Sequence, residues 1–179
     1  MKYYDTADDV LKRAQSIRLL LLDVDGVLTN GQLFYGEQGE IMKAFNTLDG
    51  QGIKLLQQNG IQVGIISGRK SVALERRAAA LGISLMAQGR EDKGNALDEL
   101  LQTHPCPLAQ IAYVGDDLPD LLVMRRIGLP IAVPNAHDSV HHCAALCTTR
   151  SGGEGAVRDV ADFLLRTQGK YDDALRAFS

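Results

Sequence analysis

Two kinds of hydrophobic pattern alternate along this chain. Short apolar runs, such as the four leucines at 19–22 and the β-branched run at 61–66, indicate strands buried on both faces of a sheet. Longer stretches, in which apolar residues recur every three or four positions, indicate amphipathic helices. The pattern predicts strands at residues 17–23, 61–66, 83–87, 110–114 and 129–133, and helices at 6–16, 49–59, 71–81, 92–103, 118–127, 137–145 and 156–167.

The regular alternation of these elements predicts an α/β fold, a Rossmann-like parallel sheet flanked by helices and joined by right-handed crossovers. One segment departs from this scheme. Residues 32–45 form two short apolar runs around a Gly-bounded turn at 36–39, which predicts a β-hairpin flap after the first strand. The length of 179 residues fits a single domain, 1–179, that includes this flap at about 32–45.

Polar side chains follow three of the predicted strands. The first strand ends in Asp23 and Asp25, and Gly26 then allows a sharp turn. The segments 67–69 and 116–120 follow two later strands, and the carboxyl ends of parallel strands meet at one edge of a sheet. We therefore expect a cluster of carboxylates there, which suits a hard cation such as magnesium.

Alternative interpretations of these residues remain open from spacing alone. Asp-x-Asp-Gly also begins calcium-binding loops, although Phe34 stands where such a loop needs a glutamate. Ser67, nearby backbone N–H groups and Lys93 could hold a phosphate group, but Lys93 could equally be a solvated residue of a first helical turn. Asp120 could simply favour a helix dipole, and Arg69 could be a surface residue.

A family resemblance adds to this picture. In chain order, Asp23–Val27, Ser67, Lys93 and Gly115–Asp120 match the four motifs of the haloacid dehalogenase-like phosphatases. Within that group, the chain resembles the capless 3-deoxy-D-manno-octulosonate 8-phosphate phosphatases in four further segments, at residues 45–50, 66–70, 113–118 and 152–158. The resemblance implies an enzyme of lipopolysaccharide precursor synthesis that hydrolyses this small sugar phosphate with Mg²⁺, through an aspartyl-phosphate.

The same resemblance implies a role for each catalytic residue. Asp23 would attack phosphorus, and Asp25 would act as the general acid and then as the base. The implied metal ligands are the Asp23 carboxylate, the Asp25 backbone carbonyl and Asp116. Ser67 and Lys93 would hold the phosphoryl oxygens.

The substrate contacts implied by the resemblance extend over a larger set of residues: Asp25, Asn46, Thr47, Leu48, Asp49, Gly50, Lys54, Arg69, Arg77, Lys93 and Asp117. Two positions depart from the family. Thr47-Leu48 stands where Val-Arg is frequent, and Lys54 stands where arginine is frequent, which keeps the charge but loses the planar fork. Asp120 is implied to orient the shell around the metal.

Composition excludes some partners. The net charge of -3 gives no reason to expect a nucleic-acid partner, and no apolar run approaches the roughly 20 residues of a membrane span. The three cysteines are odd in number and lack metal-ligand spacing, as expected for reduced cytoplasmic thiols.

The hairpin carries six large apolar residues, which cannot all be buried against its own domain. We therefore expect some of them to contact another chain, in agreement with the homotetramer that the resemblance implies. The residues concerned are Leu33, Phe34, Tyr35, Ile41, Met42 and Phe45. Two rival functions remain: a phosphatase for another nonulosonate 9-phosphate, and a non-catalytic oligomerisation module.

Overall fold

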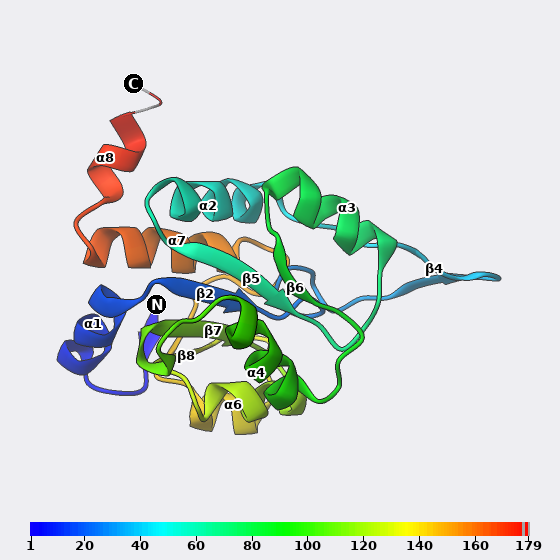
Figure 1. Cartoon of the computed structure of the whole chain (residues 1–179), viewed down its shortest axis with the longest axis horizontal. Coiled ribbons are helices and arrows are strands. Elements are labelled where there is room, and N and C mark those ends of the chain that lie inside the picture. The colour runs from blue at the N-terminus through cyan, green and yellow to red at the C-terminus, as the bar shows by residue number, and fades with distance from the viewer. Residues whose placement is uncertain (177, 179) are drawn as a thin grey trace.

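The fold is built on a mostly parallel β-sheet, seen edge-on between two layers of helices in a computed structural model (Figure 1). The structure describes residues 1–176 and 178. Within them every neighbouring pair of strands in this sheet is parallel except the antiparallel pair β1 and β9. The seven strands lie in the order β1 (Lys2–Tyr3), β9 (Leu146–Cys147), β8 (Leu129–Ala132), β7 (Ile111–Gly115), β2 (Leu19–Leu22), β5 (Gln62–Ile66) and β6 (Leu85–Ala87).

The leucines of β2 divide the interior into two cores. Leu20 and Leu22 lie in one core with side chains of five helices, of which α8 (Tyr171–Arg176) contributes Ala174, and Leu19 and Leu21 lie in the other with side chains of three. This division follows from the alternation of side chains along a strand. The first layer contains α1 (Ala7–Ser16), α2 (Thr47–Gln58), α3 (Val72–Leu81) and α7 (Ala156–Thr167), and the second contains α4 (Lys93–Thr103), α5 (Leu121–Met124) and α6 (Asp138–Cys143).

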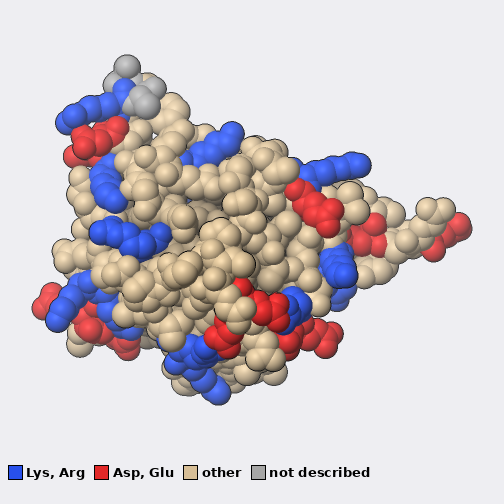
Figure 2. All heavy atoms as spheres, viewed as in Figure 1, with Lys and Arg blue, Asp and Glu red and all other residues tan. Residues whose placement is uncertain are grey.

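The hairpin β3 (Phe34–Gly36) and β4 (Gly39–Met42) forms a separate two-stranded sheet. It extends well beyond the body of the molecule, on the right in Figures 1 and 2. Its large apolar side chains remain substantially exposed, with exposed fractions from 37% to 65% at Leu33, Phe34, Tyr35, Ile41 and Met42. Phe45 differs, because it packs against the first core. On the face in Figure 2, acidic and basic side chains are interspersed.

The predicted α/β architecture and its hairpin are confirmed, and several boundaries are corrected. Helix α2 starts two residues early, because the Asn46 side chain accepts a hydrogen bond from the Leu48 N–H and caps it. The helix expected at 118–127 is a 3₁₀ turn, η2 (Leu118–Asp120), followed by the short α5. The elements not predicted are very short or lie at the chain end: β1, β9, η1 (Leu108–Gln110) and α8 (Tyr171–Arg176).

Two further expectations concern the whole chain. The single-domain organisation over residues 1–179 stays a prediction. Among residues 1–176 and 178, no helix combines the length and apolar character needed to cross a membrane.

Candidate active site

Acidic side chains meet at the carboxyl ends of β2 and β7. Asp23 follows β2, and Asp116 and Asp120 follow β7, so that one carboxylate oxygen from each lies within 4.8 Å of the others. The Lys93 ammonium, at the start of α4, donates hydrogen bonds of 2.6 Å to the Oδ1 atoms of both Asp23 and Asp120. The juxtaposition that the parallel sheet predicted is therefore present in the structure.

Asp120 uses both of its carboxylate oxygens in structural hydrogen bonds. Its Oδ1 atom accepts from the Tyr113 hydroxyl at 2.6 Å as well as from Lys93. Its Oδ2 atom accepts from the backbone N–H groups of Asp116 and Asp117, at 2.9 and 3.0 Å. Asp120 thus fixes both the loop that carries Asp116 and the lysine that contacts Asp23.

Burial and neighbouring negative charges raise the pKa values of the other two carboxyls, Asp23 and Asp116. Burial, and then the charge of Asp120, raises the pKa of Asp23 to about 6, although Lys93 partly opposes this. Burial, and then the charges of Asp23 and Asp120, raises the pKa of Asp116 to about 8. Burial alone would lower the pKa of Lys93, but Asp23 and Asp120 raise it overall. The cluster therefore has more negative charge than Lys93 neutralises.

The donor set fits a divalent cation. The Oδ1 atom of Asp116 is buried and accepts no hydrogen bond within the described protein, although most buried polar atoms have a partner. The ligands on offer, Asp23 and Asp116, are carboxylate oxygens, which magnesium prefers. The Asp25 side chain does not belong to this acidic group, which leaves it free for another role.

Asp25 faces the hairpin side of the site. Its Oδ1 atom forms an ion pair with Lys43, and its Oδ2 atom lies 3.9 Å from the Nε atom of Arg69. The Arg69 guanidinium also donates a 3.1 Å hydrogen bond to the Tyr35 hydroxyl of β3. An open cleft of about 540 Å³ runs over this group, and the predicted residues that line it are Asp23, Asp25, Ser67, Arg69, Lys93, Asp116, Asp117 and Asp120.

Small residues hold the loop after Asp25 in place. Gly26 has a φ of +102°, and a Cβ atom there would lie 2.0 Å from Asp116 Oδ2. The Asn135 side chain donates a 2.9 Å hydrogen bond to the Gly26 carbonyl and accepts one of 2.8 Å from the Gly152 N–H. Gly152 is so close that its own Cβ would lie 1.7 Å from the Gly26 carbonyl oxygen. The loop is therefore packed backbone against backbone.

The other predicted substrate contacts do not line this cleft. Asn46, Asp49, Gly50 and Arg77 lie together in a second, much smaller pocket, where Arg77 donates a 3.2 Å hydrogen bond to the Asn46 carbonyl. Their role in substrate binding stays a prediction.

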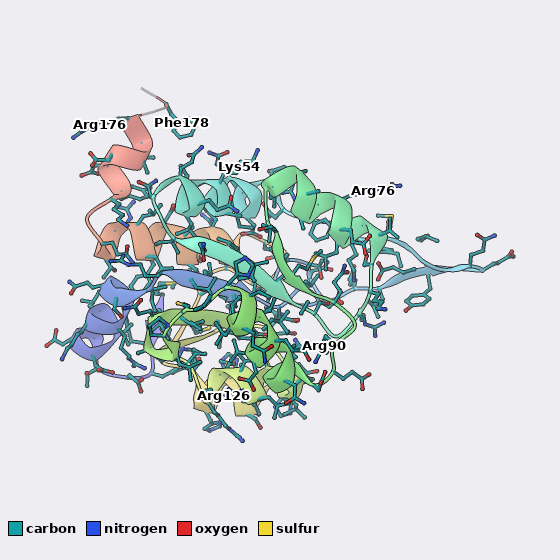
Figure 3. The ribbon with its side chains drawn as sticks, in the orientation of Figure 1. Lys54, Arg76, Arg90, Arg126, Arg176 and Phe178 are labelled. Atoms are coloured by element: carbon teal, nitrogen blue, oxygen red, sulfur yellow. The ribbon has the colours of Figure 1, made fainter. Side chains whose placement is uncertain are left out.

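Within the second pocket, Asp49 is 1% exposed and accepts a 2.8 Å hydrogen bond from the Arg158 N–H at the start of α7. Burial raises the pKa of Asp49 to about 6, an effect that backbone hydrogen bonds partly oppose. Thr47 and Leu48 are exposed at the start of α2. Lys54 is also exposed, and Figure 3 shows it pointing outward from α2, away from the sheet.

Sequence reasoning did not single out two residues of the site, Lys43 and Tyr113. A lysine in a hairpin normally indicates a solvated edge strand, and a tyrosine within a buried strand normally indicates core packing. The signal available for Tyr113 was its position two residues before the Gly115–Asp120 motif. For Lys43 the sequence carries no such signal, because its contact depends on how the hairpin folds back.

Comparison with known proteins identifies the relatives of this chain. Residues 83–160 match the family of haloacid dehalogenase-like hydrolases. The 3-deoxy-D-manno-octulosonate 8-phosphate phosphatase of Yersinia pestis is 48% identical over 172 residues, which cover 96% of this chain and 92% of that protein. The chain belongs to the 3-deoxy-D-manno-octulosonate 8-phosphate phosphatase family.

Solved structures of this family have the same fold. The 3-deoxy-D-manno-octulosonate 8-phosphate phosphatase of Moraxella catarrhalis, in complex with a magnesium ion, a phosphate ion and a KDO molecule, is 40% identical with a TM-score of 0.93. The match covers 97% of this chain and 100% of that one. A probable yrbi family phosphatase from Pseudomonas syringae is 48% identical with a TM-score of 0.92, over 96% of this chain and 98% of that one.

Proposed function

We propose that this protein is a phosphoric monoester hydrolase that acts on 3-deoxy-D-manno-octulosonate 8-phosphate with Mg²⁺, in lipopolysaccharide precursor synthesis. The observation that carries the proposal is the pair Asp23 and Asp116, with the buried and unpartnered Oδ1 atom of Asp116, beside Lys93 and Asp25 in one cleft. Membership of the family, and the magnesium, phosphate and KDO bound by the Moraxella catarrhalis relative, supply the substrate class.

In the proposed mechanism Asp23 attacks the phosphorus and forms an aspartyl-phosphate. Lys93 holds Oδ1 of this carboxylate at 2.6 Å, and together with Ser67 it would bind the phosphoryl oxygens as charge shifts onto them. Asp23 and Asp116 would hold the magnesium ion, with the backbone carbonyl of Asp25. When bound, the ion would supply positive charge that keeps both carboxylates ionised and neutralises the phosphate.

Asp25 would move the protons. In the first half-reaction it would give a proton to the bridging ester oxygen as the P–O bond breaks, because an alkoxide is a poor leaving group. In the second half-reaction the same carboxylate would accept a proton from the water that hydrolyses the aspartyl-phosphate. Its side chain lies outside the group of carboxylates suited to a metal, which supports this assignment.

The assembly is also part of the proposal. We infer a homotetramer, because the hairpin leaves five large apolar side chains exposed beside the open cleft. Contact between hairpins of neighbouring subunits would cover these side chains. The described cysteines are free thiols, which agrees with the proposed cytoplasmic location.

The experiment is a phosphate-release assay with three substrates. The native protein is expected to hydrolyse 3-deoxy-D-manno-octulosonate 8-phosphate with a higher kcat/KM than a nonulosonate 9-phosphate or p-nitrophenyl phosphate. Arg69→Ala should raise KM for the octulosonate far more than for p-nitrophenyl phosphate, because Arg69 lines the cleft where an acid sugar would lie. The matched control is Arg76→Ala, an exposed arginine that points outward from α3 (Figure 3).

Two results would contradict these assignments. A higher kcat/KM on the nonulosonate 9-phosphate would show that this rival acid sugar is the preferred substrate. Absence of turnover with every phosphate ester would favour a non-catalytic module. Equal losses on both substrates in Arg69→Ala would show that Arg69 serves the phosphate or the fold instead of the sugar.

A further inference from the structure

Lys43, on the chain returning from β4, brings a charged group of the hairpin directly to Asp25. The side chain of Lys43 is only 1% exposed, and its ammonium forms an ion pair with Asp25 Oδ1. The same ammonium lies 3.0 Å from Glu40 Oε2. Glu40 in turn accepts a 2.6 Å hydrogen bond from the Ser71 hydroxyl, and Ser71 caps α3 by accepting a hydrogen bond from the Leu74 N–H.

This chain of contacts fixes where the ammonium lies. A buried ammonium is strongly destabilising unless carboxylates are held around it, and Glu40 supplies one that is anchored to the body of the protein through Ser71. The Lys43 ammonium is therefore held near the start of α3 through Glu40 and Ser71, and this contact determines where it meets Asp25. Its contact is with Oδ1, whereas Oδ2 lies toward Arg69 in the cleft.

We propose that Lys43 is a positioning residue for proton transfer by Asp25. It holds Oδ1, so that Oδ2 is the oxygen presented to the ester oxygen of the substrate. During cleavage of the P–O bond the proton moves from Asp25 Oδ2 to the leaving oxygen, and Lys43 keeps all of its own protons. Glu40 and Ser71 serve the same purpose indirectly, because they hold Lys43.

This inference rests on the proposed function, in which Asp25 is the general acid, and it predicts a dependence on the leaving group. An alkoxide needs the proton from Asp25, whereas 4-nitrophenolate is a stable anion and leaves without one. A poorly placed Asp25 should therefore slow cleavage of alkyl phosphates selectively. The ratio kcat/KM is the quantity to compare, because it compares free enzyme and substrate with the transition state.

The test measures kcat/KM of Lys43→Met on 3-deoxy-D-manno-octulosonate 8-phosphate and on p-nitrophenyl phosphate. General acid–base catalysis contributes about 10²- to 10⁴-fold, and we expect a loss of about 100-fold on the sugar phosphate. On p-nitrophenyl phosphate we expect a loss of less than about threefold, since little protonation is required there. The control is Lys12→Met, which changes an exposed lysine of α1, and it should behave like the native protein.

Two further variants separate positioning from folding. Lys43→Arg keeps a cation beside Asp25 and should recover a large part of the activity on the sugar phosphate. Glu40→Gln removes the ion pair that holds Lys43 and should produce a smaller loss with the same selectivity for the alkyl ester. Thermal unfolding of each variant establishes that it is folded at the assay temperature.

The outcomes distinguish this proposal from the proposed function. Equal losses on the two substrates, or no loss on either, would overturn the positioning role of Lys43. A loss confined to KM for the acid sugar would overturn it too, because Lys43 would then bind the substrate. If the native protein fails to hydrolyse the octulosonate 8-phosphate, the proposed substrate is wrong, and the same comparison is made with glycerol 2-phosphate as the alkyl ester.

Discussion

Gly152 does not line the cleft, but its replacement by alanine should displace the Gly26 loop of the site. A Cβ atom at Gly152 would lie 1.7 Å from the carbonyl oxygen of Gly26 and 2.4 Å from its carbonyl carbon. Ordinary van der Waals contact begins at 3.4 Å, so the two backbones must separate by about 1.7 Å. Both contacts are with backbone, and no side-chain rotation can relieve them.

The consequences can be estimated from this displacement. Overpacking of a close-packed interior typically destabilises a protein by about 1–3 kcal/mol. Separation would also break the hydrogen bonds that join Gly152 and Gly26 through Asn135, each worth about 1 kcal/mol. For a chain of this length the resulting loss of about 3–5 kcal/mol corresponds to a fall in Tm of about 6–20 °C. If the two backbones share the separation equally, Gly26 moves by nearly 1 Å. Because Gly26 follows Asp25, this displacement should lower kcat by about 100-fold.

The assay combines thermal unfolding with phosphate release. Gly94→Ala is the matched control, because its Cβ would make only an ordinary 3.6 Å contact with Leu122 and a helical Gly→Ala change is expected to stabilise by about 0.5–1 kcal/mol. A Gly152→Ala protein with native Tm and with turnover within threefold of the native value would refute the claim that this contact positions the loop.

Three further predictions concern the nucleophile, the metal and the hairpin. Asp23→Asn should remain folded and lose phosphatase activity, because an amide cannot attack phosphorus; near-native turnover would exclude Asp23 as the nucleophile. The pKa values of Asp23 and Asp116, about 6 and about 8, lie above the ordinary value of 3.8. The metal-free folded state therefore binds more protons than the unfolded state, and the free energy of unfolding falls as pH rises from about 4 through 8. Mg²⁺ should therefore raise Tm more at pH 8 than at pH 6, and an equal rise at both would contradict this. Finally, sedimentation should detect a tetramer for the native chain and smaller species for the double variant Phe34→Ser and Ile41→Ser, whereas a native monomer with full activity would argue against the assembly.

Much of the fold follows from the sequence because its signals are local. The strands are apolar runs, and a residue such as Gly82 marks the end of a helix. The two-residue strands β1 and β9 could not be predicted, because two residues contain no periodicity. They pair only because the fold brings Lys2 beside Cys147.

The carboxylate cluster was also predictable, since a parallel sheet places the ends of its strands together. The individual side-chain contacts within the site could not be predicted. The ion pair between Lys43 and Asp25 depends on the return path of the hairpin, and the Tyr113 hydroxyl reaches Asp120 only because of the 3₁₀ turn. The position of Lys54 on the outer side of α2 likewise depends on the rotation of that helix against α7.

The four consecutive leucines of β2 have a consequence for the uniqueness of the native state. In a strand with one solvated face, a slip of one residue would turn polar side chains inward, and this opposes misalignment with the neighbouring strands. A slip within Leu19–Leu22 would exchange one leucine for another on both faces, so the apolar residues alone do not select an alignment. The alignment is instead determined at the polar end of the strand, where Asp23 must contact Lys93 and Gly26 must pass beside Asp116. Substitutions at these positions should therefore affect the fidelity of strand pairing during folding as well as chemistry.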